Sequence, residues 1–199
     1  ILAPWQAAAQ TLNPTRPYRV ELASGKSIVV FLYHQGLSTT VSFNPSATRN
    51  AESFLREQVL PLYHDDDHPE LLLIASDGEL YGHHQRFRDK FLAYLTTDGV
   101  KKNQITLTFP GLWMKQYPPR ETIQILERTS WSCDHHLLRW SGACACTENA
   151  EWKAPLKEAL DAIADRIDAV YETVTGGWGL DIWEVRNRYI QVLAGRTSL

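Results

Sequence analysis

The sequence predicts an α/β region followed by a helical region, and three patterns indicate this order. An unbroken apolar run at residues 71–75 stops at a polar turn, which is typical of a buried strand. Other short β-branched or alternating runs before residue 126 are separated by segments of helical spacing. Beyond residue 150, apolar residues recur every three or four positions. We therefore expect an α/β unit over residues 1–125 and a helical unit over residues 126–199.

The composition is that of a globular chain with a sizeable core. Hydrophobic residues make up 44% of the 199 positions, enough for one domain with a small appendage. The net charge of −3 argues against general nucleic-acid binding. No apolar run approaches the ~20 residues of a membrane span, no signal peptide is visible, and an odd cysteine count of three fits a reducing compartment. We expect a cytoplasmic protein with no nucleic acid and no membrane as partner.

A β-hairpin is predicted close to the N-terminus. Residues 18–22 alternate, residues 23–26 supply a turn, and residues 27–33 are β-branched and aromatic. The neighbouring segments have weaker patterns, which predict a strand end, a helical turn or two, and a short strand, at residues 1–4, 6–12 and 37–43 respectively.

Helices and strands then alternate up to residue 126. Helical spacing predicts helices at residues 48–60 and 84–97 and a helical turn at residues 111–117. Apolar or alternating runs predict strands at residues 71–75, 105–109 and 122–126. The acidic run at residues 65–67 lacks the glycine and the distal glutamate of an EF-hand, so we interpret it as a solvated loop.

The last part of the chain is predicted to be helical. Residues 152–175 carry apolar side chains at helical spacing, and the two glycines that follow end this helix. Residues 181–193 form the final predicted helix. Its side chains expected to face inward are Ile182, Val185, Tyr189, and Ile190 or Val192.

The loop after residues 71–75 is the first candidate site. It reads Asp-Gly-Glu-Leu-Tyr-Gly-His-His from Asp77 to His84. In α/β proteins, reacting groups collect in the loops that leave the carboxyl ends of parallel strands. Asp77 and Glu79 fit glycosidic chemistry, in which one carboxyl group protonates the leaving oxygen and a second attacks or activates water.

The same residues also have simpler interpretations. Asp77 could form an Asx turn or cap the following helix. His83 and His84 could be first-turn helix residues. As adjacent side chains they are expected to diverge, so they cannot by themselves supply the three or four converging ligands of a metal site.

A second cluster lies between the two regions. Cys133, His135 and His136 are followed by Cys144 and Cys146. These residues could bind zinc, although Cys-x-Cys is tighter than the usual Cys-x₂₋₄-Cys of structural sites. A catalytic cysteine beside a histidine is another option. We favour buried thiols and histidines that hold this loop to the helical region.

Taken together, these segments resemble glycoside hydrolase family 57. The eight residues from Asp77 to His84 resemble its catalytic-acid motif. Residues 131–133, 144–146 and 152–160 resemble an uncharacterised C-terminal domain attached to one branch of that family. Residues 1–7 resemble the strand end that follows the nucleophile region in that branch.

The resemblance implies a retaining enzyme that acts on α-glucans. Amylases, 4-α-glucanotransferases and branching enzymes belong to the family, which uses a seven-stranded (β/α) barrel without a metal or another cofactor. By similarity, Asp77 matches the general acid/base. The side chains implied to contact the α-glucan or oligosaccharide are Glu79, Tyr81, His83, His84, Trp5 and Trp131.

The resemblance also implies that residues 1–125 form only the C-terminal portion of the barrel. The family's nucleophilic glutamate lies upstream of anything in this sequence, and the first residue is Ile, as expected of a chain truncated at its N-terminus. A partial barrel leaves sheet edges unpaired. We therefore expect the missing N-terminal half of the barrel as a partner, and no activity from this fragment alone.

Three alternatives stay open. A non-catalytic carbohydrate-binding or scaffolding protein would stack sugars on its tryptophans, namely Trp5, Trp113, Trp131 and Trp140. A metal-dependent hydrolase or deacetylase on a related barrel would use Asp77 with His83 or His84 and with His135. A purely structural subunit of a larger assembly would need none of these side chains.

Overall fold

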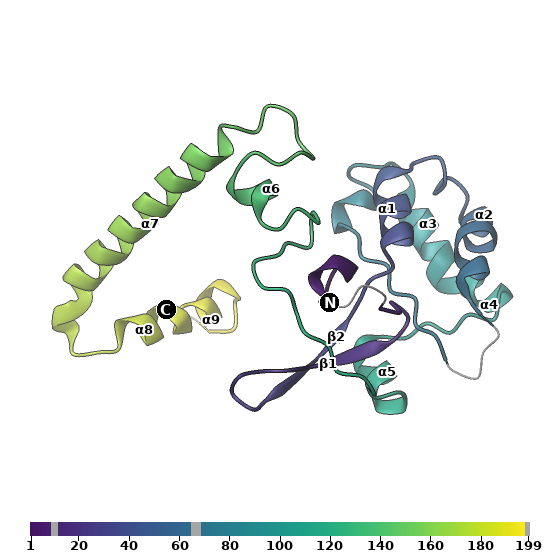
Figure 1. The fold of residues 1–199 in the computed structure, drawn as a ribbon, viewed down its shortest axis with the longest axis horizontal. Helices are drawn as coiled ribbons and strands as arrows, with labels where there is room; N and C mark the ends of the chain where they lie inside the picture. Colours follow the sequence, from purple (N-terminus) through teal and green to yellow (C-terminus); the bar gives the residue numbers. More distant parts are fainter. Residues whose placement is uncertain (9–11, 65–68, 198–199) are drawn as a thin grey trace. The chain divides into compact units, whose positions relative to one another are not determined.

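The computed structural model describes residues 1–8, 12–64 and 69–197, which fold as two compact units, Ile1–His136 and Leu137–Leu199 (Figure 1). The acidic run at residues 65–67, predicted to be a solvated loop, lies outside the described residues. Within the described part of the chain, no helix has both the length and the apolar character needed to cross a membrane.

The predicted hairpin is confirmed. Strands β1 (Pro17–Glu21) and β2 (Ser27–Phe31) pair antiparallel. The Leu22 N–H donates to the Lys26 carbonyl at 2.8 Å and closes the turn. Gly25 lies in that turn at φ +76°, a backbone conformation that glycine adopts without steric cost.

The segments beside the hairpin pair through isolated bridges rather than full strands. The bridges join Leu2 with Leu32, Arg19 with Thr122, and Ala7 with Ile125. The strands predicted at residues 1–4 and 122–126 therefore do not form; only Leu2, Thr122 and Ile125 in these described segments make isolated bridges. Of the helical turns predicted at residues 6–12, residues 9–11 lie outside the described residues; the 3₁₀ turn η1 (Pro4–Gln6) ends where the predicted turns begin.

The hairpin and these bridges surround a small core. Its buried members are Ala7, Tyr18, Val20, Val30, Leu32 and Ile123. The Tyr18 side chain is 1% exposed, and its hydroxyl donates to the Asn13 carbonyl at 2.9 Å. Burial, followed by the nearby negative charge of Glu121, raises the pKa of Tyr18. The ring thus contributes apolar area while its polar tip keeps a hydrogen bond.

The strand predicted at residues 37–43 is wrong, because this segment is the helix α1 (Gln35–Phe43). His34 caps the helix: its Nδ1 accepts the Leu37 N–H at 3.2 Å. Leu37 and Val41, four residues apart, share one face and are both buried. A short apolar run fits a strand and a buried helix equally well. Here the His34 cap and the core contacts of Leu37 and Val41 favour the helix.

Two interrupted helices pack with α1 around a second core. Helix α2 (Ala51–Phe54) continues through the π-helical turn η2 (Leu55–Val59) and the 3₁₀ turn η3 (Leu60–Leu62). Helix α3 (Arg88–Tyr94) continues through the π-helical turn η5 (Leu95–Gly99) into α4 (Val100–Lys102). Figure 1 shows α1 to α4 gathered together. The helices predicted at residues 48–60 and 84–97 are confirmed with later starts. The buried members of this core are Leu37, Val41, Phe54, Leu55, Val59, Leu80 and Phe91.

The described structure contains no strand at residues 71–75 or 105–109, so both predictions are wrong. Three hydrogen bonds hold residues 71–75, each to a different partner: Leu71 N–H to the Thr15 carbonyl at 3.0 Å, His34 N–H to the Leu73 carbonyl at 2.8 Å, and Ala75 N–H to Ser38 Oγ at 3.0 Å. A strand requires a ladder with one partner. The only named sheet among the described residues has the order β1-β2, so the (β/α) barrel expected from the resemblance is not closed in them.

A short helix follows the second of these segments. Helix α5 (Pro110–Gln116) begins with Pro110 at its first turn, where proline costs no hydrogen bond. It confirms the helical turn predicted at residues 111–117.

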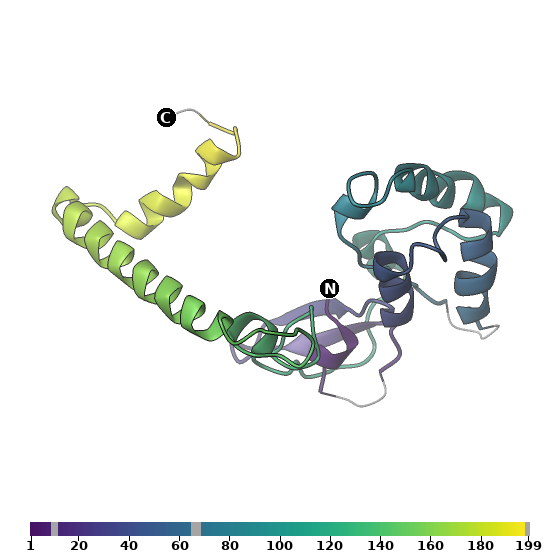
Figure 2. The same cartoon turned by 90° about the horizontal axis from the view of Figure 1, so that it is seen from above.

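The second unit is helical; the helix predicted at residues 152–175 is confirmed, and the one predicted at residues 181–193 forms two short helices. It contains α6 (Leu138–Ser141), α7 (Lys153–Thr175), the 3₁₀ turn η6 (Gly176–Trp178), α8 (Ile182–Arg188) and α9 (Ile190–Leu193). The chain turns back after α7 (Figure 2). The Tyr171 hydroxyl donates to the Ile182 carbonyl at 2.7 Å and joins the two arms of this turn. Val185, Tyr189 and Ile190, expected to face inward, are 37%, 46% and 61% exposed. Tyr171 of α7 contacts Ile182 and Trp183 of α8 instead.

We expect Gly99→Ala to destabilise the first unit. A Cβ at position 99 would lie 2.6 Å from Leu55 Cδ1, and Leu55 is 3% exposed, so the core has to shift. Overpacking of this kind costs about 1–3 kcal/mol. The free energy of unfolding in urea measures it. In the control Gly111→Ala, the new Cβ meets Phe109 at an ordinary 3.5 Å, and the change should be neutral or stabilising. Equal losses in both variants would contradict this packing.

We also expect Ser38→Ala to destabilise the segment that leads to Asp77. Ser38 is buried in α1, and its Oγ accepts the Ala75 N–H. Removal of the hydroxyl leaves that N–H without its partner, at a cost of about 1–3 kcal/mol. Thr39→Ala changes an exposed hydroxyl on the same helix and serves as the control. Hydrogen exchange at the Ala75 amide should accelerate in Ser38→Ala alone; unchanged exchange there would show that the bond carries no stability.

Candidate functional site

The Asp77 loop is a short 3₁₀ turn with a defined backbone. Asp77 precedes η4 (Gly78–Leu80), and its carbonyl accepts the Leu80 N–H at 3.3 Å. The His84 N–H donates to the Glu79 carbonyl at 2.8 Å. Gly82, at φ +121°, lies between these contacts in a conformation that favours glycine. The Asp77 side chain makes no capping hydrogen bond, so the helix-cap interpretation is wrong.

Two side chains anchor this loop to the protein. Leu80 is 9% exposed and belongs to the core formed with α1, α2 and α3. Tyr81 is half-buried, and its hydroxyl lies 2.8 Å from Ser76 Oγ. Core packing therefore holds the loop at Leu80, and a hydrogen bond holds it at the next residue, Tyr81.

The remaining polar side chains of the loop face solvent. Asp77, Glu79, His83 and His84 are all exposed. The rings of His83 and His84 stack with centroids 4.6 Å apart and planes 23° apart, so the expectation that they diverge is wrong. The loop presents two carboxylates and two imidazoles, all groups that transfer protons or bind sugar hydroxyls. Both carboxylates come from one turn and can serve one side of a substrate.

The predicted aromatic residues Trp5 and Trp131 differ in their surroundings. Trp5 is half-buried, meets the Tyr33 ring edge-on at 6.1 Å, and donates its indole N–H to the Ser130 carbonyl at 2.8 Å. The Tyr33 hydroxyl donates to the Trp131 carbonyl at 3.2 Å, and burial raises the pKa of Tyr33. The Trp131 side chain is 59% exposed. Trp5 therefore holds the chain at Ser130 and Tyr33 holds it at Trp131, while the Trp131 ring is accessible.

The sequence did not predict two hollows that lie beside α5. They measure about 120 and 560 Å³ and share Pro69, Trp113, Gln116 and Tyr117 in their walls. Arg16, Arg120 and Glu121 complete the polar wall of the smaller one. Among the described residues, Trp113 Nε1 is buried without a hydrogen-bond partner. Of these walls the sequence indicated only Trp113, as a tryptophan that could stack on a sugar, because the walls come from separate loops. No described residue of the Asp77 loop lines either hollow.

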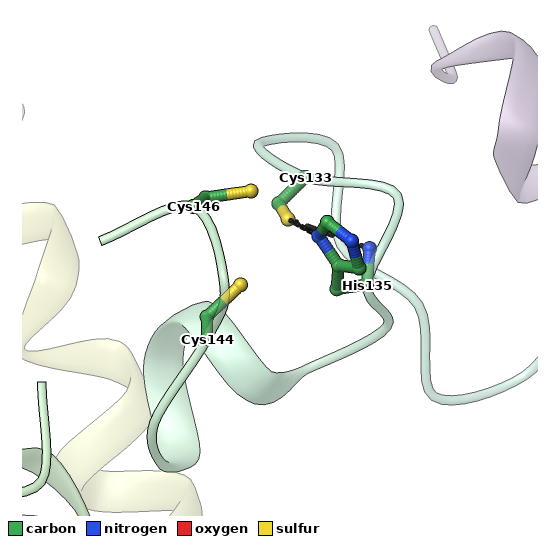
Figure 3. A group of neighbouring side chains, drawn as sticks. All are labelled: Cys133, His135, Cys144 and Cys146. Atoms are coloured by element: carbon green, nitrogen blue, oxygen red, sulfur yellow. Dashed lines mark hydrogen bonds between the residues drawn. The ribbon is translucent and has the colours of Figure 1, made fainter. Parts of the chain in front are cut away.

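The Cys/His segment gathers four potential metal ligands. Ligand atoms of Cys133, His135, Cys144 and Cys146 all lie within 4.8 Å of one another (Figure 3). Cys133 and Cys144 are buried, whereas Cys146, His135 and His136 are exposed, so the prediction of buried thiols and histidines is confirmed for two thiols and wrong for the two histidines and for Cys146. Within the described part of the chain, Asp77, His83 and His84 do not join a group of three or more such ligands.

Comparison with known proteins identifies the family. Residues 149–198 match the model of a domain of unknown function (DUF3536). No curated protein and no solved structure matches the chain. Residues 4–126 match the model of glycosyl hydrolase family 57, whose function is in general that of a glycoside hydrolase on a carbohydrate substrate. Because this match covers more than half of the 199 residues, the chain belongs to glycosyl hydrolase family 57, with a second, uncharacterised domain after it.

Proposed function

We propose that this chain is part of a retaining α-glucan hydrolase or glucanotransferase in which Asp77 is the general acid/base. The family match over residues 4–126 supports carbohydrate chemistry. The observation that carries the assignment is the Asp77 loop, in which Leu80 is buried and the Asp77 carboxylate is exposed and takes no part in capping.

In a retaining mechanism, the carboxyl group of Asp77 acts as an acid in the first step and as a base in the second. In the first, Asp77 gives its proton to the glycosidic oxygen as the bond to the sugar breaks and a nucleophilic carboxylate forms the covalent glycosyl-enzyme. In the second, the Asp77 carboxylate takes a proton from water, which completes hydrolysis, or from a sugar hydroxyl, which completes transfer. The exposed position of Asp77 leaves its oxygens accessible to an incoming glucan.

The nucleophile has to come from a different element. In retaining enzymes the two carboxyl groups lie about 5–5.5 Å apart and act on opposite sides of the bond that is cleaved. Glu79 belongs to the same three-residue turn that Asp77 begins, so it reaches the sugar from the same side. We propose that the nucleophilic glutamate is supplied by chain upstream of residue 1, in the N-terminal half of the barrel. These 199 residues alone would then have no activity.

The neighbours of Asp77 have supporting roles in this proposal. Glu79, His83 and His84 are exposed in the same loop and suit hydrogen bonds to sugar hydroxyls. Tyr81 helps to position the loop and does not bind the sugar through its hydroxyl, since that hydroxyl already lies 2.8 Å from Ser76 Oγ. The accessible Trp131 ring suits stacking on a sugar face, and Trp5 supports the backbone at that point.

In an active full-length protein that contains this sequence, we expect Asp77→Asn to lower kcat/KM on maltooligosaccharides by about 10²–10⁴-fold, the usual contribution of a general acid. On an aryl glucoside with a strongly acidic phenol, the loss in the glycosylation step should be far smaller, because such a leaving group needs no proton. Steady-state kinetics on both substrates measure the difference.

Glu79→Gln and Asp89→Asn are the matched controls for that experiment. Glu79 lies in the same turn and Asp89 in α3, and both side chains are exposed. Neither change should show the leaving-group dependence of Asp77→Asn. Full activity of Asp77→Asn, or an equal loss on both substrates, would show that Asp77 is not the acid.

A second candidate function is glucan binding at the smaller hollow beside α5. Trp113 lines this hollow together with Arg16, Arg120 and Glu121, and its indole N–H is buried without a partner among the described residues. Sugar hydroxyls are suitable acceptors for that N–H, and the Tyr117 ring lies 4.5 Å from Trp113. In this case the 199-residue chain binds oligosaccharide without turnover.

Calorimetry of the 199-residue chain with a maltooligosaccharide tests this second candidate. Trp113→Phe keeps an aromatic ring but removes the N–H, so we expect the affinity to fall about tenfold, the value of one hydrogen bond of 1.4 kcal/mol. Trp178→Phe, at an exposed position in η6, is the control. Absence of binding, or equal affinities in all three proteins, would exclude a glucan site at this hollow.

A further inference from the structure

We propose that Cys133, His135, Cys144 and Cys146 bind one Zn²⁺ ion in a structural site. All four residues belong to one continuous stretch of chain, residues 133–146, so their proximity follows from the local fold of that stretch. The site is independent of the glycosidic chemistry assigned to Asp77.

The four ligand atoms are spaced slightly more widely than in a zinc-bound tetrahedral site. Zinc holds sulfur at about 2.3 Å and imidazole nitrogen at about 2.0–2.1 Å, which places tetrahedral ligand atoms about 3.5–3.8 Å from each other. In this protein the four ligand atoms lie within 4.8 Å of one another, and Cys133 Sγ is 3.1 Å from His135 Nδ1. Figure 3 shows the sulfur atoms of Cys144 and Cys146 directed toward the other two side chains. Small side-chain rotations close the remaining gap.

The donor set selects both the metal and its role. Three thiolates and one neutral imidazole form a Cys₃His set, which is a standard ligand set of structural zinc. Thiolates discriminate against Mg²⁺ and Ca²⁺, which prefer oxygen. Four protein ligands leave no open position for water or substrate, so the ion would hold the fold rather than take part in a reaction.

The proposed ligands have polar neighbours that help to position them. The His135 backbone N–H donates to Cys133 Sγ at 3.4 Å, a hydrogen bond that orients this sulfur. The Asp134 carboxylate lies 3.4 Å from His135 Nδ1 and is exposed. Cys133 and Cys144 are buried, whereas His135 and Cys146 are exposed. Two ligands are therefore already packed, and the other two leave an entry path for the ion.

The stretch contains little regular secondary structure. Between Cys133 and Cys146 its regular structure is the four-residue helix α6, and His136 adopts φ +56°, which is uncommon for a residue with a side chain. A cross-link between residues 133–135 and 144–146 supplies the order that a short segment without a large core lacks.

The test is the metal content of the full chain, purified without chelators, followed by Zn²⁺ titration of the chelator-treated protein. We expect one zinc per chain and one tight site. Co²⁺ in the same site should show intense visible bands of tetrahedral coordination and thiolate-to-cobalt charge transfer. His135→Ala and Cys146→Ser should each lower the zinc affinity by more than the roughly 10–100-fold that loss of an outer-sphere partner causes.

Both of these ligands are exposed, so the variants remove a ligand without a cavity in the core. His136→Ala, next to the site, and His83→Ala, in the Asp77 loop, are the matched controls and should bind zinc as tightly as the unaltered chain. Circular dichroism checks that each variant is folded. Substoichiometric weak binding, unchanged affinity in His135→Ala and Cys146→Ser, or a disulfide among the three cysteines as the major form in alkylated protein would each overturn the proposal.

Discussion

The burial of Leu80 in the helical core is the interaction on which the candidate catalytic loop depends. Full burial of a leucine side chain stabilises a fold by about 1.5–3 kcal/mol. Here that contact fixes the middle of a loop whose only regular element is a three-residue turn. Because Asp77 lies three residues before Leu80 and His83 three residues after it, one apolar anchor positions polar groups on both sides. The close approach of η5 to η2 at Gly99 completes the same core.

Two hydrogen bonds made by Ala75 and Ser76, just before the loop, complete this support. Ser38 in α1 accepts the Ala75 N–H, and Ser76 pairs with the Tyr81 hydroxyl. These contacts leave the carboxylates of Asp77 and Glu79 exposed on a positioned backbone. A catalytic group has to be held by such neighbours, since small displacements are costly in rate. The arrangement provides one side of a glycosidase site, and the chemistry of retention requires a carboxylate from elsewhere.

The rest of the chain is held by different forces. Helix α7 keeps its own backbone hydrogen bonds over 23 residues, and the exposed Lys157–Asp161 pair at 2.6 Å adds only about 0.3–0.5 kcal/mol. The stretch at residues 133–146 contains the four-residue helix α6, and three thiols and one imidazole converge in it. In the proposed arrangement, zinc anchors this stretch as the burial of Leu80 anchors the Asp77 loop.

The sequence by itself determined the features whose physics is local. Alternation and Gly25 specify the hairpin, apolar spacing specifies α7, and the residues from Asp77 to His84 carry the family resemblance that the match over residues 4–126 confirms. Tertiary structure decided the rest. A helix satisfies its backbone within its own segment, whereas a strand needs partners from elsewhere, so residues 37–43 became α1 and residues 71–75 formed no ladder. Only folding could bring the sulfur atoms of residues 144 and 146 to Cys133, or place Trp113 at the wall of a hollow, because both depend on loops whose paths no periodicity encodes.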